Sequence, residues 1–204
     1  FIPLGAVAIF FAKSTGGLIG AIAGIGLLLV LWKKTRLPTI IFGAVCLIGL
    51  FLTPTNPFRQ ELLLQDRSGQ LRVAMWGETI EFLSDNPLFG AGLASYKTLI
   101  YPYRIDKWIE VFHHPHNIFL TMWVNLGLLG LIGFVWILVW FFRVGLMYSR
   151  HNPHLKYLLA AMFTVITTGM VDSPYIKNDL SLFFWLLPAL MIINLEPIAK
   201  NKIN

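Results

Sequence analysis

The most regular feature of the chain is a series of long apolar stretches separated by polar segments. A membrane-spanning helix needs about 20 mostly apolar residues, with roughly 17 to 25 tolerated. Five stretches approach or reach that length, at residues 14–32, 38–53, 117–142, 155–171 and 180–195. The opening FIPLGAVAIFFA has the character of the last part of a further span. The pattern therefore predicts an all-α, multi-spanning transmembrane helical bundle.

One polar segment, residues 54–115, is much longer than a usual connection between helices. It contains several tryptophans and tyrosines, which are sparse in disordered linkers, so we expect it to be folded. The predicted organisation is listed in chain order: transmembrane helices over 1–53 with the first one truncated, an outer loop with short helices over 54–115, transmembrane helices over 116–195, and a cytoplasmic tail over 196–204.

Composition and charge support a membrane location and set the orientation. Hydrophobic residues make up 56% of the chain and charged residues only 13%, which is far from the balance of soluble domains. The positive-inside rule favours a cytoplasmic position for the basic segment KKTR at residues 33–36. Alternation of the spans then leaves residues 54–115 outside. The net charge of +6 is scattered over short cytoplasmic segments, whereas nucleic-acid binding needs a clustered basic surface, so no nucleic acid is predicted as partner.

The outer loop is predicted to contain an amphipathic helix within SGQLRVAMWGETIEFLSDNPLFGAG. Pro87 and the glycines that follow it should end this helix. On a helical wheel one side holds Arg72, Met75, Trp76, Thr79 and Leu83, and the opposite side holds Glu78, Glu81 and Asp85. Such a helix lies in the membrane interface or covers a cavity. Arg72 then either binds lipid phosphate or faces a functional site.

A histidine cluster stands at the start of the third apolar stretch, in HHPHNIFLTMWVNLGLLG. If a helix begins near His116, Gly127 and Gly130 lie on the same face as that histidine. Small residues at this spacing allow another helix to approach closely. This interpretation puts His116 at the outer mouth of a helix interface, where a histidine can exchange protons at ordinary pH and serve as a general base.

Two other interpretations of the histidines stay open at this point. His113, His114 and His116 could bind a metal, although their spacing across a proline differs from the i, i+4 pair of helical metal sites. They could also be polar residues at the water boundary. The single cysteine, Cys46, excludes a disulfide within the chain.

Two motifs in this region resemble those of the O-antigen ligase family. His116, Asn117, nine residues, Gly127, two residues and Gly130 are similar to the family's His-Asn, nine, Gly-x-x-Gly signature. The preceding Arg72, Trp76, Asp85, Pro87, Gly90 and Gly92 are similar to its Arg, Trp, Asp-x-Pro-x-x-Gly-x-Gly segment. The motifs occur in the family's order, and the chain would be the C-terminal half of a larger member.

The resemblance implies a multi-pass protein of the bacterial inner (plasma) membrane, with loop 54–115 and the active site facing the periplasm. It implies a metal-independent, inverting glycosyltransferase without a cofactor, which transfers a glycan from undecaprenyl diphosphate to lipid A core or to another glycan or protein acceptor. One alternative is a polysaccharide polymerase whose acceptor is a second lipid-linked glycan. A lipid-linked sugar transporter is the other alternative, but transporters place polar groups near the bilayer midplane, and here they gather at the outer surface.

The resemblance also implies roles for individual residues. His116, as base, and Arg72, as the cation on the leaving diphosphate, are the predicted catalytic pair. The predicted substrate-binding residues are Lys13, His114, Asn117, Trp76 and Asp172. No metal site is predicted.

Three of these residues have competing interpretations. Lys13 lies in AKSTGG, where family members often carry Ser-Arg-Gly, and Thr15 stands in place of the arginine. Asp172 either orients the histidine or binds sugar hydroxyls, or it is a solvated residue in a turn. Trp76 either stacks on a sugar ring or belongs to an aromatic belt at the headgroup level.

Overall fold

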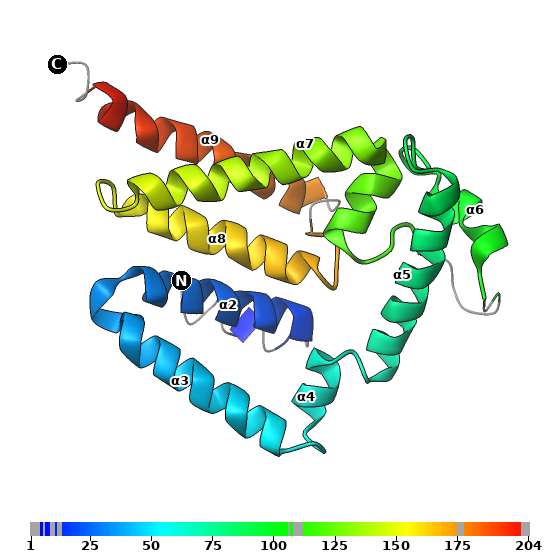
Figure 1. The fold of residues 1–204 in the computed structure, drawn as a ribbon, viewed down its shortest axis with the longest axis horizontal. Helices are drawn as coiled ribbons and strands as arrows, with labels where there is room; N and C mark the ends of the chain where they lie inside the picture. The colour runs from blue at the N-terminus through cyan, green and yellow to red at the C-terminus, as the bar shows by residue number, and fades with distance from the viewer. Residues whose placement is uncertain are drawn as a thin grey trace. The chain divides into compact units, whose positions relative to one another are not determined.

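The computed structural model describes residues 5, 7, 8, 11, 14–105, 107, 112–174 and 178–200, and every regular element in these ranges is helical (Figure 1). The elements are α2 (Thr15–Leu31), α3 (Lys33–Leu52), α4 (Pro57–Leu62), α5 (Arg67–Asp85), α6 (Tyr96–Leu99), the 3-10 helix η1 (Tyr101–Tyr103), α7 (Ile118–Tyr148), α8 (His154–Gly169) and α9 (Asn178–Lys200). The all-α prediction is confirmed for the described residues.

Each of the five predicted apolar stretches coincides with a helix. Two helices, α3 and α7, are long and apolar enough to cross a membrane. Shorter apolar helices cover Thr15–Leu31 and Leu180–Leu195. A bundle with more spans than these two stays a prediction.

The basic KKTR segment is not the loop that the sequence suggested, because α3 begins at Lys33 directly after Trp32. The connection is short because side chains in the first turn of α3 satisfy carbonyls at the end of α2. Thr35 Oγ1 donates to Leu29 O (2.6 Å) and Arg36 Nε donates to Val30 O (2.9 Å). The last carbonyls of a helix have no partner within it, so these bonds stabilise an abrupt turn.

The chain forms two compact units, and the first comprises residues 1–45, 141–168 and 178–204. Within it α2 lies beside α8 (Figure 1), and a Cβ at Gly20 or Gly24 would clash with Thr168 or Thr164. Small residues thus allow these helices to approach closely. The unit buries the apolar side chains Phe141, Leu155, Leu159, Met162, Phe184 and Met191.

The second unit comprises residues 46–140 and 169–177. Its apolar core consists of Phe82, Leu83, Tyr96, Ile100 and Val124. The predicted loop helix is confirmed as α5, which begins after Asp66, whose carboxylate accepts from the backbone N–H groups of Ser68 (3.1 Å) and Gly69 (3.2 Å). This is the usual N-cap arrangement. The described residues of segment 54–115 are therefore folded, as the composition of this segment indicated.

The predicted polar side of α5 is wrong at Glu78, which is only 4% exposed. Arg104 Nε lies 3.1 Å from Glu78 Oε2, and the backbone N–H of Ile105 donates to Glu78 Oε1 (2.9 Å). A buried carboxylate is tolerated only when it is paired and hydrogen-bonded. The pair fastens the segment after η1 onto α5, which a helical wheel of α5 alone cannot reveal.

Candidate functional site

His116 lies immediately before α7 in an unusual backbone conformation. Its φ is 50°, a left-handed value that costs energy for a residue with a Cβ and is often found at functional sites. Asn117 then caps α7, because its Oδ1 accepts from the backbone N–H groups of Phe119 (3.0 Å) and Leu120 (3.1 Å). His116 is therefore placed outside the helix, and the expectation that it shares a helical face with Gly127 and Gly130 is wrong.

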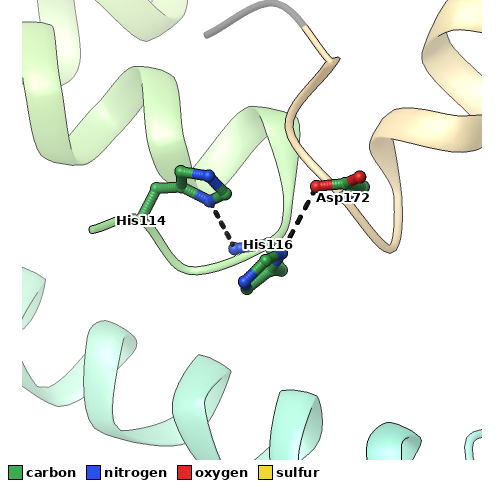
Figure 2. Close-up of side chains that lie close together, drawn as sticks. All are labelled: His114, His116 and Asp172. Atoms are coloured by element: carbon green, nitrogen blue, oxygen red, sulfur yellow. Dashed lines mark hydrogen bonds and ion pairs between the residues drawn. The ribbon is translucent and has the colours of Figure 1, made fainter. Parts of the chain in front are cut away.

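The imidazole of His116 lies beside the carboxylate of Asp172, with 3.3 Å between Nδ1 and Oδ1 (Figure 2). Their side chains are 24% and 32% exposed, respectively, so both remain accessible. The ring of His114 packs edge-on against that of His116 at 4.5 Å between centroids, and its Nδ1 accepts from His116 N (3.4 Å). The structure thus brings together three of the predicted site residues.

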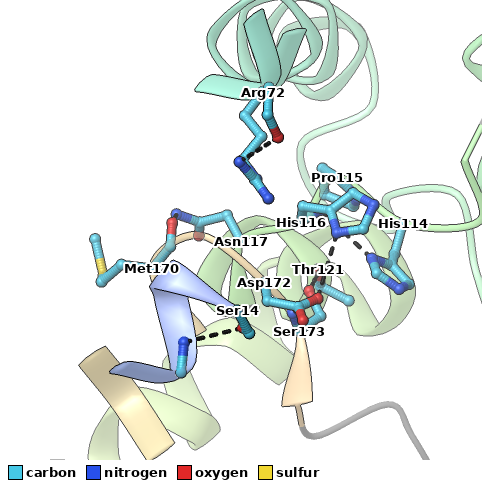
Figure 3. Close-up of polar contacts among 12 residues, drawn as sticks. Ser14, Arg72, His114, Pro115, His116, Asn117, Thr121, Met170, Asp172 and Ser173 are labelled. Atoms are coloured by element: carbon cyan, nitrogen blue, oxygen red, sulfur yellow. Dashed lines mark hydrogen bonds and ion pairs between the residues drawn. The ribbon is translucent and has the colours of Figure 1, made fainter. Parts of the chain in front are cut away.

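Asp172 is held there by the turn in which it lies. Asn117 Nδ2 donates to Met170 O (3.1 Å), and the hydroxyls of Thr121 and Ser173 share a buried hydrogen bond of 2.8 Å (Figure 3). The backbone N–H of Ser173 also donates to Asp172 Oδ1 (2.7 Å). These contacts attach residues 170–173 to the first turns of α7. The amide of Asn117, predicted to bind substrate, is engaged in this scaffold.

Arg72 and Trp76 lie on α5, one turn apart. The indole Nε1 of Trp76 donates to Pro115 O (2.8 Å), so this side chain holds the histidine segment. Arg72 Nη1 donates to Ser68 Oγ (2.8 Å), and Figure 3 shows its guanidinium extending from α5 towards the segment of His116 and Asn117. The side chains of both motifs therefore face a common region of the second unit.

Lys13, a further predicted substrate-binding residue, lies outside the described residues. Elsewhere in the second unit Tyr96 is buried, and its hydroxyl shares a 2.7 Å hydrogen bond with Thr79. Burial raises the pKa of Tyr96 to about 12, because a phenolate loses its hydration there.

The two sequence motifs meet through their backbones. Helix α7 is interrupted at Gly127, whose φ of 68° and ψ of −174° are not helical. Val124 O accepts from Ala91 N (2.7 Å) and Gly92 N (3.1 Å), while Leu128 N donates to Leu88 O (3.1 Å). In a regular helix Leu128 N would donate to Val124 O. Here both groups bond instead to the backbone of the loop after α5.

Glycine is required at this junction for two reasons. Gly90 and Gly127 both have positive φ, at 63° and 68°, where a Cβ is unfavourable. A Cβ at Gly90 would also overlap Val124 O, and one at Gly127 would overlap Leu88 O. Gly127 therefore accommodates a loop backbone, where the sequence suggested a second helix. A glycine inside a long apolar run was the available signal, but its partner could not be inferred.

The histidines and the aspartate also offer the donor atoms of a metal site. Among the described residues, His114, His116 and Asp172 offer ligand atoms that all lie within 4.8 Å of one another. Asp172 and His116 can also form a hydrogen-bonded relay, in which the carboxylate orients the imidazole and the imidazole moves a proton.

A family model described as O-Antigen ligase matches residues 1–135, which include both motifs and exclude Asp172. A comparison with curated proteins gave no match.

Proposed function

Since the chain belongs to the O-antigen ligase family, we propose that it transfers a glycan from undecaprenyl diphosphate to an acceptor hydroxyl at the periplasmic surface of the inner membrane. The family is one of ligase- and polymerase-type membrane glycosyltransferases. The proposal includes a multi-spanning bundle, with loop 54–115 in the periplasm and the tail 196–204 in the cytoplasm. The observation that carries it is the placement of His116 beside Asp172, with Arg72 extending towards the same segment.

His116 is the proposed base. Its Nδ1 faces Asp172 Oδ1, so the tautomer with a proton on Nδ1 is favoured and Nε2 is left with a free lone pair. Nε2 accepts the proton of the acceptor hydroxyl as its oxygen forms the bond to the anomeric carbon. Asp172 is a positioning residue that orients the ring and stabilises the imidazolium.

Arg72 is the proposed cation for the leaving group. The bond between the anomeric carbon and the diphosphate oxygen breaks as the acceptor attacks, and negative charge grows on the diphosphate. A guanidinium binds phosphate oxygens through two parallel hydrogen bonds, and charge stabilisation of this kind is often the largest catalytic contribution. Attack opposite the leaving group inverts the anomeric centre. This scheme requires no metal or cofactor.

The remaining predicted residues have supporting roles in this proposal. Trp76 and Asn117 position the histidine segment through Pro115 and Met170. His114 contacts the substrate at the edge of the imidazole pair. Lys13, which the sequence suggested as a second cation for the diphosphate, lies outside the described residues and stays a prediction.

The test uses purified full-length protein with an undecaprenyl-diphosphate glycan and candidate acceptors, namely lipid A core and a second lipid-linked glycan. His116→Ala and Arg72→Ala should each abolish transfer while the protein still inserts and accumulates, and His113→Ala, an exposed neighbour, should remain active. Transfer retained in both site variants would contradict the mechanism. Products attached to lipid A core indicate a ligase, and lengthened lipid-linked glycans indicate a polymerase.

A further inference from the structure

The residues around His116 also have the composition of a metal-binding site. We propose that His114, His116 and Asp172 bind a divalent transition-metal ion such as Zn²⁺, and that this ion inhibits glycan transfer. The inhibition rests on the proposed function, because it requires His116 to act in the reaction. The binding itself does not depend on that function.

The donor set determines which ions fit. Two imidazoles and one carboxylate suit Zn²⁺, Co²⁺, Ni²⁺ and Cu²⁺, whereas Mg²⁺ and Ca²⁺ prefer sites made of oxygen. Three protein ligands leave one position of a tetrahedral ion for water. The side chains of His116 and Asp172 are 24% and 32% exposed, so an ion can enter from the solvent.

One separation between the ligand atoms, that of His116 and Asp172, already matches coordination, and all three atoms lie within 4.8 Å of one another. Two ligand atoms at the usual distance from a tetrahedral zinc ion lie about 3.3 Å apart, and His116 Nδ1 lies 3.3 Å from Asp172 Oδ1. A strong hydrogen bond between such groups would be about 2.8 Å. The contact of His114 Nδ1 with His116 N is also long, at 3.4 Å. These two long contacts are the ones that coordination would replace.

The ligands are supported by separate parts of the second unit. Pro115 lies between the two histidines, and its carbonyl is held by Trp76 Nε1 (2.8 Å). Asp172 is fixed by the backbone N–H of Ser173 (2.7 Å). The three ligand atoms already lie within 4.8 Å of one another, and coordination requires them to move closer around one ion. Partners that orient metal ligands in this way increase affinity.

Coordination through Nδ1 would remove the basic nitrogen of His116. A neutral imidazole carries one proton, so when the metal occupies Nδ1 the proton resides on Nε2. Nε2 then donates and can no longer accept the proton of the acceptor hydroxyl. The ion would also neutralise Asp172, which the proposed mechanism uses to stabilise the imidazolium.

Metal binding is tested first, without any glycan. Purified metal-free full-length protein is titrated with ZnCl₂ by calorimetry and with CoCl₂ by visible absorption, comparing wild type with His114→Gln. His113→Gln is the matched control, because His113 is exposed next to the cluster and is not one of the three ligands. We expect saturable binding in wild type and control, and at least about ten-fold weaker binding in His114→Gln. Absence of saturable binding, or equal affinity in His114→Gln, would overturn the site.

Inhibition is then measured with each variant compared with its own metal-free rate. Zn²⁺ should inhibit wild type and His113→Gln over the concentration range in which it binds, EDTA should restore the rate, and His114→Gln should need at least about ten-fold more Zn²⁺. If Zn²⁺ binds but does not slow transfer, the proposed inhibition is wrong and His116 is not the base. The metal site itself would still be supported. The two proposals therefore fail in different measurements.

Discussion

The indole nitrogen of Trp76 donates a hydrogen bond of 2.8 Å to the carbonyl oxygen of Pro115. These residues are 39 positions apart. Trp76 belongs to the first motif, and Pro115 lies directly before the second. Pro115 precedes His116, so the bond links the helix that carries Arg72 to the backbone of the proposed base. The relationship gives Trp76 a role in positioning that requires no contact with a sugar.

Replacement of Trp76 by Phe should therefore slow transfer without preventing folding. The lost hydrogen bond is worth about 1 kcal/mol, and a small displacement of a catalytic group can cost far more in rate than in stability. We expect about a ten-fold fall in kcat with little change in the KM for the lipid-linked glycan. Trp136→Phe, at an α7 position that is 72% exposed, is the control. An increase in KM alone would instead indicate that Trp76 binds substrate.

Gly127→Ala should destabilise the protein, because the new Cβ would overlap Leu88 O and the positive φ would be strained. We expect a loss of about 1–3 kcal/mol, measured as a lower Tm in detergent. Gly133→Ala is a control on the same helix, since nothing lies within 4 Å of its Cβ position. Equal Tm values for the two variants would mean that the junction between the loop and α7 is not rigid.

Much of the fold could be predicted because helix periodicity and apolar length are local properties. The helices α5 and α7 were both predicted. The end of α5 follows from Pro87, and the start of α7 follows from Asn117. The burial of Glu78 could not be predicted, because its partner Arg104 lies beyond the helix and pairs through the tertiary fold. The sequence thus specifies elements more directly than it specifies their contacts.

The candidate site was predicted in the same incomplete way. The motifs identified His116 and Arg72, but the helical face assumed for His116 was wrong, since a left-handed residue before a cap has no sequence signal of its own. Asp172 was a candidate with a competing interpretation as a solvated turn. Its position beside His116 depends on the Thr121 to Ser173 hydrogen bond between distant segments.

Asp172→Asn tests whether the carboxylate orients the proposed base. An amide can present its N–H to Nδ1, which favours the tautomer that has no lone pair on Nε2. We expect kcat to fall by about 10²-fold or more, with a smaller change in KM. Asp66→Asn is the control, because asparagine caps a helix about as well as aspartate. A normal kcat in Asp172→Asn would contradict the relay.

Arg72→Lys separates charge from shape at the diphosphate. Lysine keeps the positive charge but lacks the planar fork that forms two parallel hydrogen bonds to phosphate. We expect transfer to fall by about ten-fold or more, whereas Arg67→Lys, at an exposed position of α5, should behave as wild type. Full activity in Arg72→Lys would mean that only the charge is needed.

The buried Tyr96 predicts a loss of stability in alkaline solution. Burial raises its pKa to about 12 from the usual value of 10.0, so the folded protein holds the phenolic proton where the unfolded chain releases it. The resulting stability is fully present below pH 10 and is lost as the pH rises towards 12, by up to about 3 kcal/mol.

Tyr96→Phe removes this ionisation, although it also breaks the bond to Thr79. The Tm of wild type should therefore fall more steeply between pH 10 and 12 than that of Tyr96→Phe. Parallel curves of Tm against pH would show that other groups cause the loss of stability in alkali. The control is Tyr101→Phe, at a 51% exposed position, which should follow wild type.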